Sequence, residues 1–151
     1  MRELHLIAHD IRSLENVGAL FRTCDSLGVA KLWLSGYTVA PPDPRIDKVA
    51  LGAQKSVSFE IVKDIEALLD RLTSEGIPIY ALEITPDAHD LATFRAPNRL
   101  ALLLGTETTG IPPSLLERCA GAVKITQQGK KESLNVAVAA GIASWAILSR
   151  E

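Results

Sequence analysis

The sequence has few of the features that mark secreted and membrane proteins. It holds two cysteines, Cys24 and Cys119, too few for a disulfide framework, and both lie in apolar helical contexts that favour reduced, buried thiols. No apolar run reaches the roughly 20 residues that a membrane-spanning helix needs, and no secretory signal opens the chain. We therefore expect a cytoplasmic protein.

The sequence also lacks an excess of charge of one sign. Sixteen Lys and Arg face eighteen Asp and Glu, and the net charge of −2 is unlike that of general nucleic-acid binders, which are usually basic. A local basic patch is still compatible with this balance. The cations that could form one lie in or beside unusual polar segments: Arg12, Arg22, Arg45, Lys48, Lys55, Lys130 and Lys131.

Several ligand-binding motifs are missing. No Gly-x-Gly-x-x-Gly follows a predicted strand, which argues against a nucleotide-dependent oxidoreductase. The Gly-rich turn at 105–110 lacks the Gly-Lys-Ser/Thr ending of a phosphate-binding loop. His5, His9 and His89 are scattered without metal-ligand spacing, so we expect structural or surface roles for them and no metal site.

The chain has the composition and pattern of one α/β domain. Its 151 residues are 47% hydrophobic and 23% charged, enough to enclose a core. Predicted strands alternate with predicted helices, which indicates a mostly parallel sheet flanked by helices. The expected strands are 4–8, 31–35, 57–62, 78–83, 100–104 and 123–126, and the expected helices are 16–27, 65–75, 112–119 and 133–149. Three prolines and Asp43 predict a loop over 36–45.

The last predicted helix, 133–149, has no clear polar face. A helix that is apolar all round must be buried all round, and a domain of this size has little room to enclose its own C-terminal helix. We infer a homodimer in which the outer face of this helix meets a second subunit. The alternative is a helix covered by loops of its own chain.

Three segments interrupt apolar elements with polar residues, and the first is 15–25. Asn16 is a good helix N-cap, because its side chain can accept from free backbone N–H groups. Arg22 lies close to the apolar stripe of the helix and needs an anionic partner. That partner is either a carboxylate such as Asp25 or a phosphate.

The second segment, 104–113, carries a buried strand into a Gly-rich turn and then a helix. Ligands of α/β sheets bind beyond the carboxyl ends of strands, and glycines allow the backbone to approach them closely. Glu107 would repel a phosphate, so the turn suits a cationic or hydroxyl-bearing ligand better.

The third segment, 125–136, leads a polar, basic loop into the most apolar helix. Ser133 is the expected N-cap of that helix. Asn135, expected within its first turn, must find hydrogen-bond partners. Lys130 and Lys131 are either ordinary surface charges or phosphate contacts.

In this order, the three segments resemble the signature motifs of the SpoU (TrmH-type) branch of the SPOUT RNA methyltransferases. The resemblance extends from Ile11 to Trp145. It implies an α/β fold with a C-terminal trefoil knot, and a homodimer. The matching residues are Asn16-Val17-Gly18 with Arg22, Gly105-Thr106-Glu107 with Gly110, and Ser133-Leu134-Asn135-Val136.

The same resemblance implies transfer of a methyl group from S-adenosylmethionine (SAM) to a ribose 2′-OH of RNA, without a metal. Arg22, Glu107, Ser133 and Asn135 match residues implicated in catalysis, and Asn16 holds the first motif together. The family's proposed base matches Arg22, but arginine scarcely deprotonates, so it could instead anchor a phosphate or orient the hydroxyl. The implied cofactor-binding residues are Leu82, Gly105, Thr106, Gly110, Ile125, Gln127, Ser133 and Leu134. The seven cations named above are the candidate RNA contacts.

The resemblance leaves the RNA class open. Minimal family members of this length favour tRNA over rRNA as the substrate, and single-stranded loops are where unstacked nucleotides can be presented. A non-catalytic SAM- or RNA-binding module of the same fold is the other alternative, although it would not need Arg22, Glu107, Ser133 and Asn135. We expect residues 1–151 to form a single methyltransferase domain without a separate RNA-binding extension.

Overall fold

The chain folds around one parallel β-sheet. A computed structural model describes residues 1–106 and 108–150, and within them seven strands pair in the order β3-β2-β1-β6-β4-β7-β5. Each neighbouring pair is parallel. The predicted sheet type is therefore confirmed. The strands are β1 Glu3–His9, β2 Lys31–Ser35, β3 Phe59–Val62, β4 Ile79–Leu82, β5 His89–Asp90, β6 Arg99–Leu104 and β7 Gly121–Lys124.

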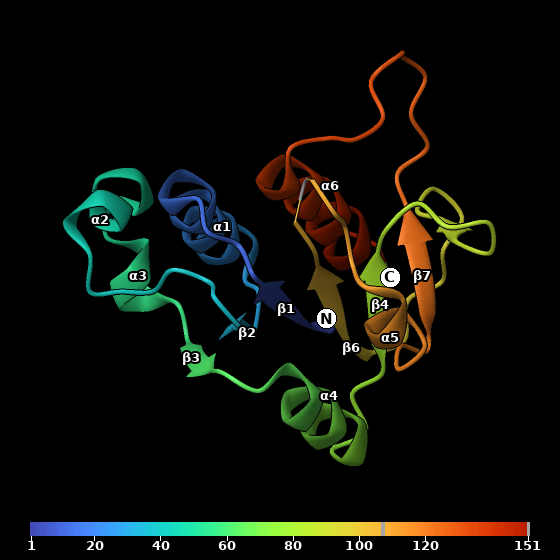
Figure 1. Cartoon of the computed structure of the whole chain (residues 1–151), viewed down its shortest axis with the longest axis horizontal. Coiled ribbons are helices and arrows are strands. Elements are labelled where there is room, and N and C mark those ends of the chain that lie inside the picture. Colours follow the sequence, from blue (N-terminus) through green and yellow to red (C-terminus); the bar gives the residue numbers. More distant parts are fainter. Residues whose placement is uncertain (107, 151) are drawn as a thin grey trace.

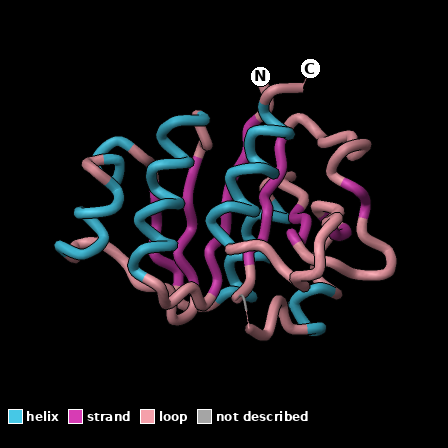
Figure 2. The backbone as a smooth tube through the Cα atoms, turned by 90° about the horizontal axis from the view of Figure 1, so that it is seen from above, coloured by secondary structure: helices cyan, strands magenta, loops and turns pink. Residues whose placement is uncertain are grey.

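Helices cover both faces of the sheet (Figure 1). On one face α1, α2, α3 and α6 lie together, while α4 and α5 lie on the other. Seen from above, α6 and α1 lie beside each other and run along the direction of the strands (Figure 2). No helix in residues 1–106 or 108–150 is long and apolar enough to span a membrane. The helices are α1 Leu14–Leu27, α2 Pro44–Ala50, α3 Ala53–Ser56, α4 Ile65–Ser74, α5 Pro113–Leu116 and α6 Val136–Leu148.

Two apolar cores lie on the two faces, because alternate side chains of a strand point in opposite directions. Leu6 of β1 packs with Phe21 of α1, whereas Ile7 packs with Leu72 of α4. In β6, all five residues from Leu100 to Leu104 are buried. A strand covered on both faces reads as a continuous apolar run, which is why the sequence identified this one.

The structure corrects both predicted helix caps. Helix α1 begins two residues earlier than expected, because the Ser13 hydroxyl accepts from the Asn16 backbone N–H at 3.2 Å and serves as its N-cap. Helix α6 begins later than expected. Its N-cap is Asn135 and not Ser133, since the Asn135 side-chain oxygen accepts from the backbone N–H groups of Ala137 and Val138.

The segment after β2 was only partly predicted. The expected loop over 36–45 ends at Asp43, whose side chain caps α2, and Pro44 occupies the first turn of that helix. Helices α2 and α3 were both missed, as was the two-residue strand β5. Proline at the start of a helix is common, because its missing N–H has no helical partner there in any case.

Helix α6 presents an apolar face that its own chain does not cover. Its inner residues, among them Ala140 and Ala143, are fully buried against the body of the domain. Its outer residues Val138, Ile142 and Trp145 are 50%, 42% and 62% exposed. The helix is thus apolar all round, as predicted, and loops of the same chain do not enclose it.

Candidate active site

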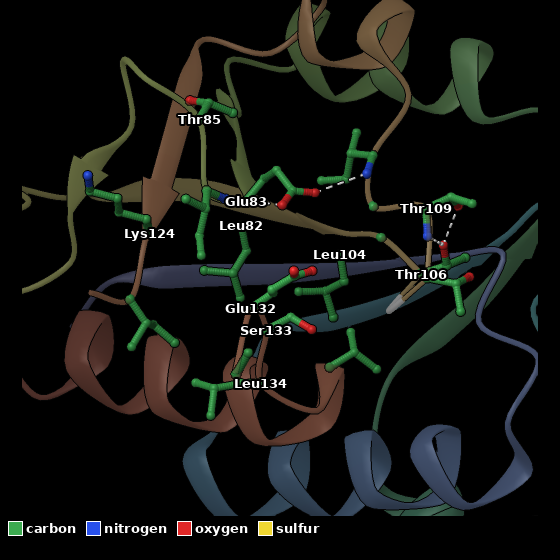
Figure 3. Close-up of a pocket in the computed structure, with 18 of the residues that line it drawn as sticks. Leu82, Glu83, Thr85, Leu104, Thr106, Thr109, Lys124, Glu132, Ser133 and Leu134 are labelled. Atoms are coloured by element: carbon green, nitrogen blue, oxygen red, sulfur yellow. Dashed lines mark hydrogen bonds between the residues drawn. The ribbon is translucent and has the colours of Figure 1, made fainter. Parts of the chain in front are cut away.

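A cavity of about 530 Å³ opens where β4, β6 and β7 end. Its walls come from residues that follow these three strands and from the loop that leads into α6 (Figure 3). The volume lies within the ~300–1,000 Å³ of small-molecule pockets, and the position is where α/β sheets bind ligands. We call this the first cavity.

All eight residues predicted to bind the cofactor line the first cavity. Leu82, Ile125 and Leu134 contribute apolar side chains from three separate segments. Several polar lining residues lie outside the predicted set, either at or just after the ends of strands or before α6. These are Glu83, Thr85, Lys124 and Glu132.

Glu83 braces the Gly-rich turn from the neighbouring strand. Its carboxylate accepts from the backbone N–H of Ile111 at 3.1 Å and from that of Ile84 at 3.1 Å. Hydrogen bonds from backbone N–H groups to a carboxylate are charge-assisted and stronger than those between neutral groups. Glu83 was part of a predicted strand, and the contact with Ile111 depends on the pairing of β4 with β6, which its sequence neighbours do not reveal.

The two glycines of the turn lie where any side chain would overlap neighbouring residues of the chain. A Cβ atom on Gly105 would lie 2.6 Å from Ile111, and one on Gly110 would lie 2.5 Å from the Glu83 carboxylate. Gly110 also has a φ of 67°, which disfavours other residues. The turn is closed by the Thr106 and Thr109 hydroxyls, 2.6 Å apart. This backbone is thus a close-fitting wall of the first cavity.

A second cavity, of about 420 Å³, adjoins the first. The two share Thr106, Thr108, Thr109 and Val136 as lining residues. The other walls of the second cavity come from Asn16 and the segment 10–13, which follows β1. A ligand in the first cavity and one in the second would therefore lie side by side.

The predicted catalytic residues divide between these cavities and another surface. Ser133 lines the first cavity and Asn16 lines the second. The Asn135 side-chain amide donates to the Asn16 side-chain oxygen at 3.0 Å, which brings the first and third motifs together. Glu107 lies outside the described residues.

Arg22 is not brought to either cavity. It is exposed on α1 and lines one groove with Trp145 of α6 and another with Leu51 and Gly52. Within one chain, Arg22 thus lies beside the uncovered apolar face of α6. Its separation from the other motif residues is the main difference between the predicted and observed sites.

Gly18 of the first motif has a packing role. It is buried in α1, and a Cβ atom there would lie 2.7 Å from the Val49 Cβ and 3.1 Å from the carbonyl oxygen of Ile46. The motif glycine therefore allows α2 to approach α1 closely.

The seven predicted RNA-contacting cations are all exposed but do not form one patch in the single chain. Lys48 and Lys55 lie on α2 and α3, at one end of the molecule, whereas Lys130 and Lys131 lie on the loop between β7 and α6 at the other (Figure 1). Arg45 pairs with Asp43 at 3.0 Å. Arg12 is the cation of the set that lines the second cavity.

The cysteines and two of the histidines have structural surroundings. Burial raises the pKa of Cys24 to about 12 and that of Cys119 to about 11, so both thiols stay protonated at neutral pH. The Trp33 indole donates to His5 Nδ1 at 3.0 Å, and His9 Nδ1 lies 3.0 Å from the Ser35 hydroxyl. Burial lowers the pKa of His9, against the smaller opposing effect of Asp10.

The chain is similar to known RNA-modifying proteins. A tRNA (guanosine(18)-2′-O)-methyltransferase of Thermus thermophilus is 30% identical over 93% of this chain and 71% of its own length. Curated relatives vary in size, and the chain spans from 9% to 71% of their lengths.

Two solved structures share the fold. One, reported for the 2-OH methylation of C/U34 on tRNA, is 28% identical, with a TM-score of 0.85, covering 95% of this chain and 93% of that one. The SpoU methyltransferase AviRb of Streptomyces viridochromogenes, solved with AdoMet, is 23% identical with a TM-score of 0.89, covering 97% of this chain and 60% of that one. The profile of the SpoU rRNA Methylase family matches residues 3–145, and the chain belongs to that family.

Proposed function

We propose that this chain transfers a methyl group from SAM to the 2′-OH of an RNA ribose. The observation that carries the proposal is the pair of adjoining cavities, one lined by the second and third motifs and the other by the first. Two reactants must be held side by side for a direct transfer between them. A non-catalytic module that binds SAM or RNA alone would need only one of these cavities, whereas direct transfer needs both side by side.

The residues of the first cavity fit SAM. Leu82, Ile125 and Leu134 offer apolar surface for the adenine ring, and the Gly105–Gly110 turn offers backbone at close range. Among the described lining residues, Glu83 and Glu132 outnumber the one cation, Lys124, and this excess of carboxylates suits a sulfonium and an amino group. When bound, SAM supplies an activated methyl group with its own leaving group, so the protein has to position the acceptor and remove its proton.

The residues of the second cavity are suited to position the acceptor. Asn16 is held by the Asn135 amide, and the Thr106 hydroxyl lies on the wall that both cavities share. Polar groups held by their neighbours bind a hydroxyl in one orientation, which is the condition for an in-line transfer. We assign Asn16 and Asn135 to orienting the ribose.

A homodimer would bring Arg22 into the site. Arg22 borders the apolar face formed by Val138, Ile142 and Trp145, so pairing of two such faces places it at the subunit boundary. Exposed apolar patches of this kind mark contact surfaces. We propose that α6 forms the dimer interface and that Arg22 serves the active site of the partner. As a cation it would anchor a phosphate or orient the hydroxyl.

The substrate is proposed to be tRNA. The solved structure reported for methylation of C/U34 on tRNA is nearly the same length as this chain, and the Thermus relative is named for guanosine 18 of tRNA. The second candidate is rRNA, for which the family is named. In either case an unpaired nucleotide fits the second cavity better than a base-paired one.

Incubation with isotopically labelled SAM and unmodified total tRNA or rRNA, in parallel, tests the proposal. We expect label in tRNA. Label in rRNA alone would show that the substrate is rRNA, the second candidate. No label in either pool, with SAM binding intact by calorimetry, would favour the non-catalytic module.

A further inference from the structure

An exposed aromatic ring lies next to the second cavity and is unused by the function proposed so far. Tyr37 follows β2 and is 71% exposed, the highest exposure of any described large apolar or aromatic side chain except Met1. The Arg12 guanidinium lies over its ring, 5.0 Å from the ring centre, and Arg12 also lines the second cavity. With Arg12 over one face and so much of the residue exposed, the other face of the ring is open to solvent.

The backbone beneath Tyr37 is fixed by several contacts. The Asp10 carboxylate accepts from the Tyr37 backbone N–H at 2.8 Å, and Asp10 itself has a φ of 56°. Gly36 has a φ of 60°, and a Cβ atom there would lie 2.1 Å from the Asp10 carboxylate. Because the two segments fit together this closely, the ring has a defined base although its tip is in solvent.

The next residue ties the same two segments together. The buried Thr38 hydroxyl donates to the Ala8 carbonyl at 2.7 Å and accepts from the Ile11 backbone N–H at 3.1 Å. The Val39 backbone N–H donates to the Ile11 carbonyl at 3.1 Å. Three successive residues of the β2 loop thus hold the β1 loop, which carries Asp10 and Arg12 into the second cavity.

These features suit an unpaired nucleobase. Every base has a flat π-face that stacks on an aromatic side chain, and a neighbouring cation attracts the phosphate beside it. A rigidly based ring with one open face loses little conformational freedom when a base stacks on it. We propose that Tyr37 and Arg12 form a stacking platform for an unpaired nucleobase of the RNA, at the entrance of the second cavity. The inference rests on RNA being the substrate.

Stacking on Tyr37 predicts a preference for single-stranded over duplex RNA, which attraction between charges alone does not predict. A stacked base must be unpaired, so Tyr37→Ala should weaken binding of a single-stranded oligoribonucleotide of mixed sequence by roughly tenfold. Binding of an RNA duplex of the same length should not change, since its bases are stacked on one another. Tyr37→Leu, which keeps apolar bulk without a π-face, should behave like the alanine variant, and Tyr37→Phe like the wild type.

Binding is measured by fluorescence anisotropy of the labelled RNAs on the full chain, with thermal unfolding and light scattering as controls. Equal affinity of wild type and Tyr37→Ala for the single strand would overturn the platform, as would an equal loss on the duplex. A change in oligomeric mass in Tyr37→Ala, with a parallel loss on both RNAs, would also overturn it and make Tyr37 a subunit contact.

The same variants separate this inference from the proposed function. If wild type methylates RNA and Tyr37→Ala does so with unchanged KM, the platform fails while the function stands. If wild type binds the single strand in a manner that depends on Tyr37 but transfers no methyl group, the platform stands and the catalytic function fails. The expected result is a raised KM for RNA with unchanged kcat and unchanged SAM affinity.

Discussion

Asn135 both caps α6 and joins that helix to α1, because its side-chain oxygen accepts from Ala137 and Val138 while its amide donates to Asn16 at 3.0 Å. Asn135→Ala should lower the free energy of unfolding by ~1 kcal/mol or more through loss of the cap. Asn135→Ser keeps a capping oxygen and removes the amide, so it should retain most of the stability and lose methyl transfer. Urea unfolding and initial rates measure the two effects. A serine variant with wild-type rates would show that Asn135 only caps the helix.

Gly110→Ala should impair SAM binding with little effect on the rest of the fold. The added Cβ would lie 2.5 Å from the Glu83 carboxylate at a φ of 67°, so the wall of the first cavity must shift. We expect SAM affinity measured by calorimetry to fall by roughly tenfold or more, about 1.4 kcal/mol. Gly129→Ala is the matched control, because a Cβ there meets nothing within 4 Å. Equal affinities of the two variants would contradict SAM binding against this turn.

Gly18→Ala should destabilise the contact between α1 and α2. Overpacking of a buried position costs typically ~1–3 kcal/mol, and the new Cβ would lie 2.7 Å from the Val49 Cβ. Val49→Ala leaves the Val49 Cβ but removes its Cγ1, which would lie 3.0 Å from the new Cβ, so it should relieve part of that cost. In a double-mutant cycle by thermal unfolding, Val49→Ala should therefore cost less in the Gly18→Ala background than alone. Additive effects would show that the Val49 Cγ1 contributes nothing to the clash.

The apolar face of α6 should control the oligomeric state. Trp145 is 62% exposed in the single chain, and Trp145→Glu places a charge in the proposed interface. We expect wild type to be a dimer by light scattering at micromolar concentration and Trp145→Glu to be a monomer without methyl transfer. Glu117→Lys, an exposed change directly after α5 on the other face of the sheet, serves as a charge-altering control. A monomeric wild type with full activity would overturn both the interface and the role of Arg22 across it.

The amino-acid sequence predicts the sheet well because burial on both faces leaves a strong pattern, as in the continuous apolar run of β6. It predicts helix ends less well where several capping residues compete. Ser13 and Asn16 are both good caps, and only the choice of Ser13 frees the Asn16 side chain to contact α6. The prolines around Asp43 indicate a loop and a helix start equally, and α2 was missed for that reason.

The candidate site, like the fold, is only partly predictable from the sequence. The predicted residues of the first cavity follow from the family resemblance. The contact between Glu83 and Ile111 could not be predicted, because it depends on the pairing of β4 with β6. No local pattern reveals that Arg22 lines neither cavity of its own chain, since that depends on how α1 and α6 pack. The trefoil knot implied by the family resemblance stays a prediction.

The most direct test of the central claim is the chemical position of the transferred methyl group. After reaction with labelled SAM, the RNA is hydrolysed with alkali, which needs a free 2′-OH to cleave the chain, and the products are identified by mass spectrometry. Transfer to the ribose 2′-OH predicts that the label appears in alkali-resistant dinucleotides. Label in mononucleotides would place the methyl group on a base and contradict the account.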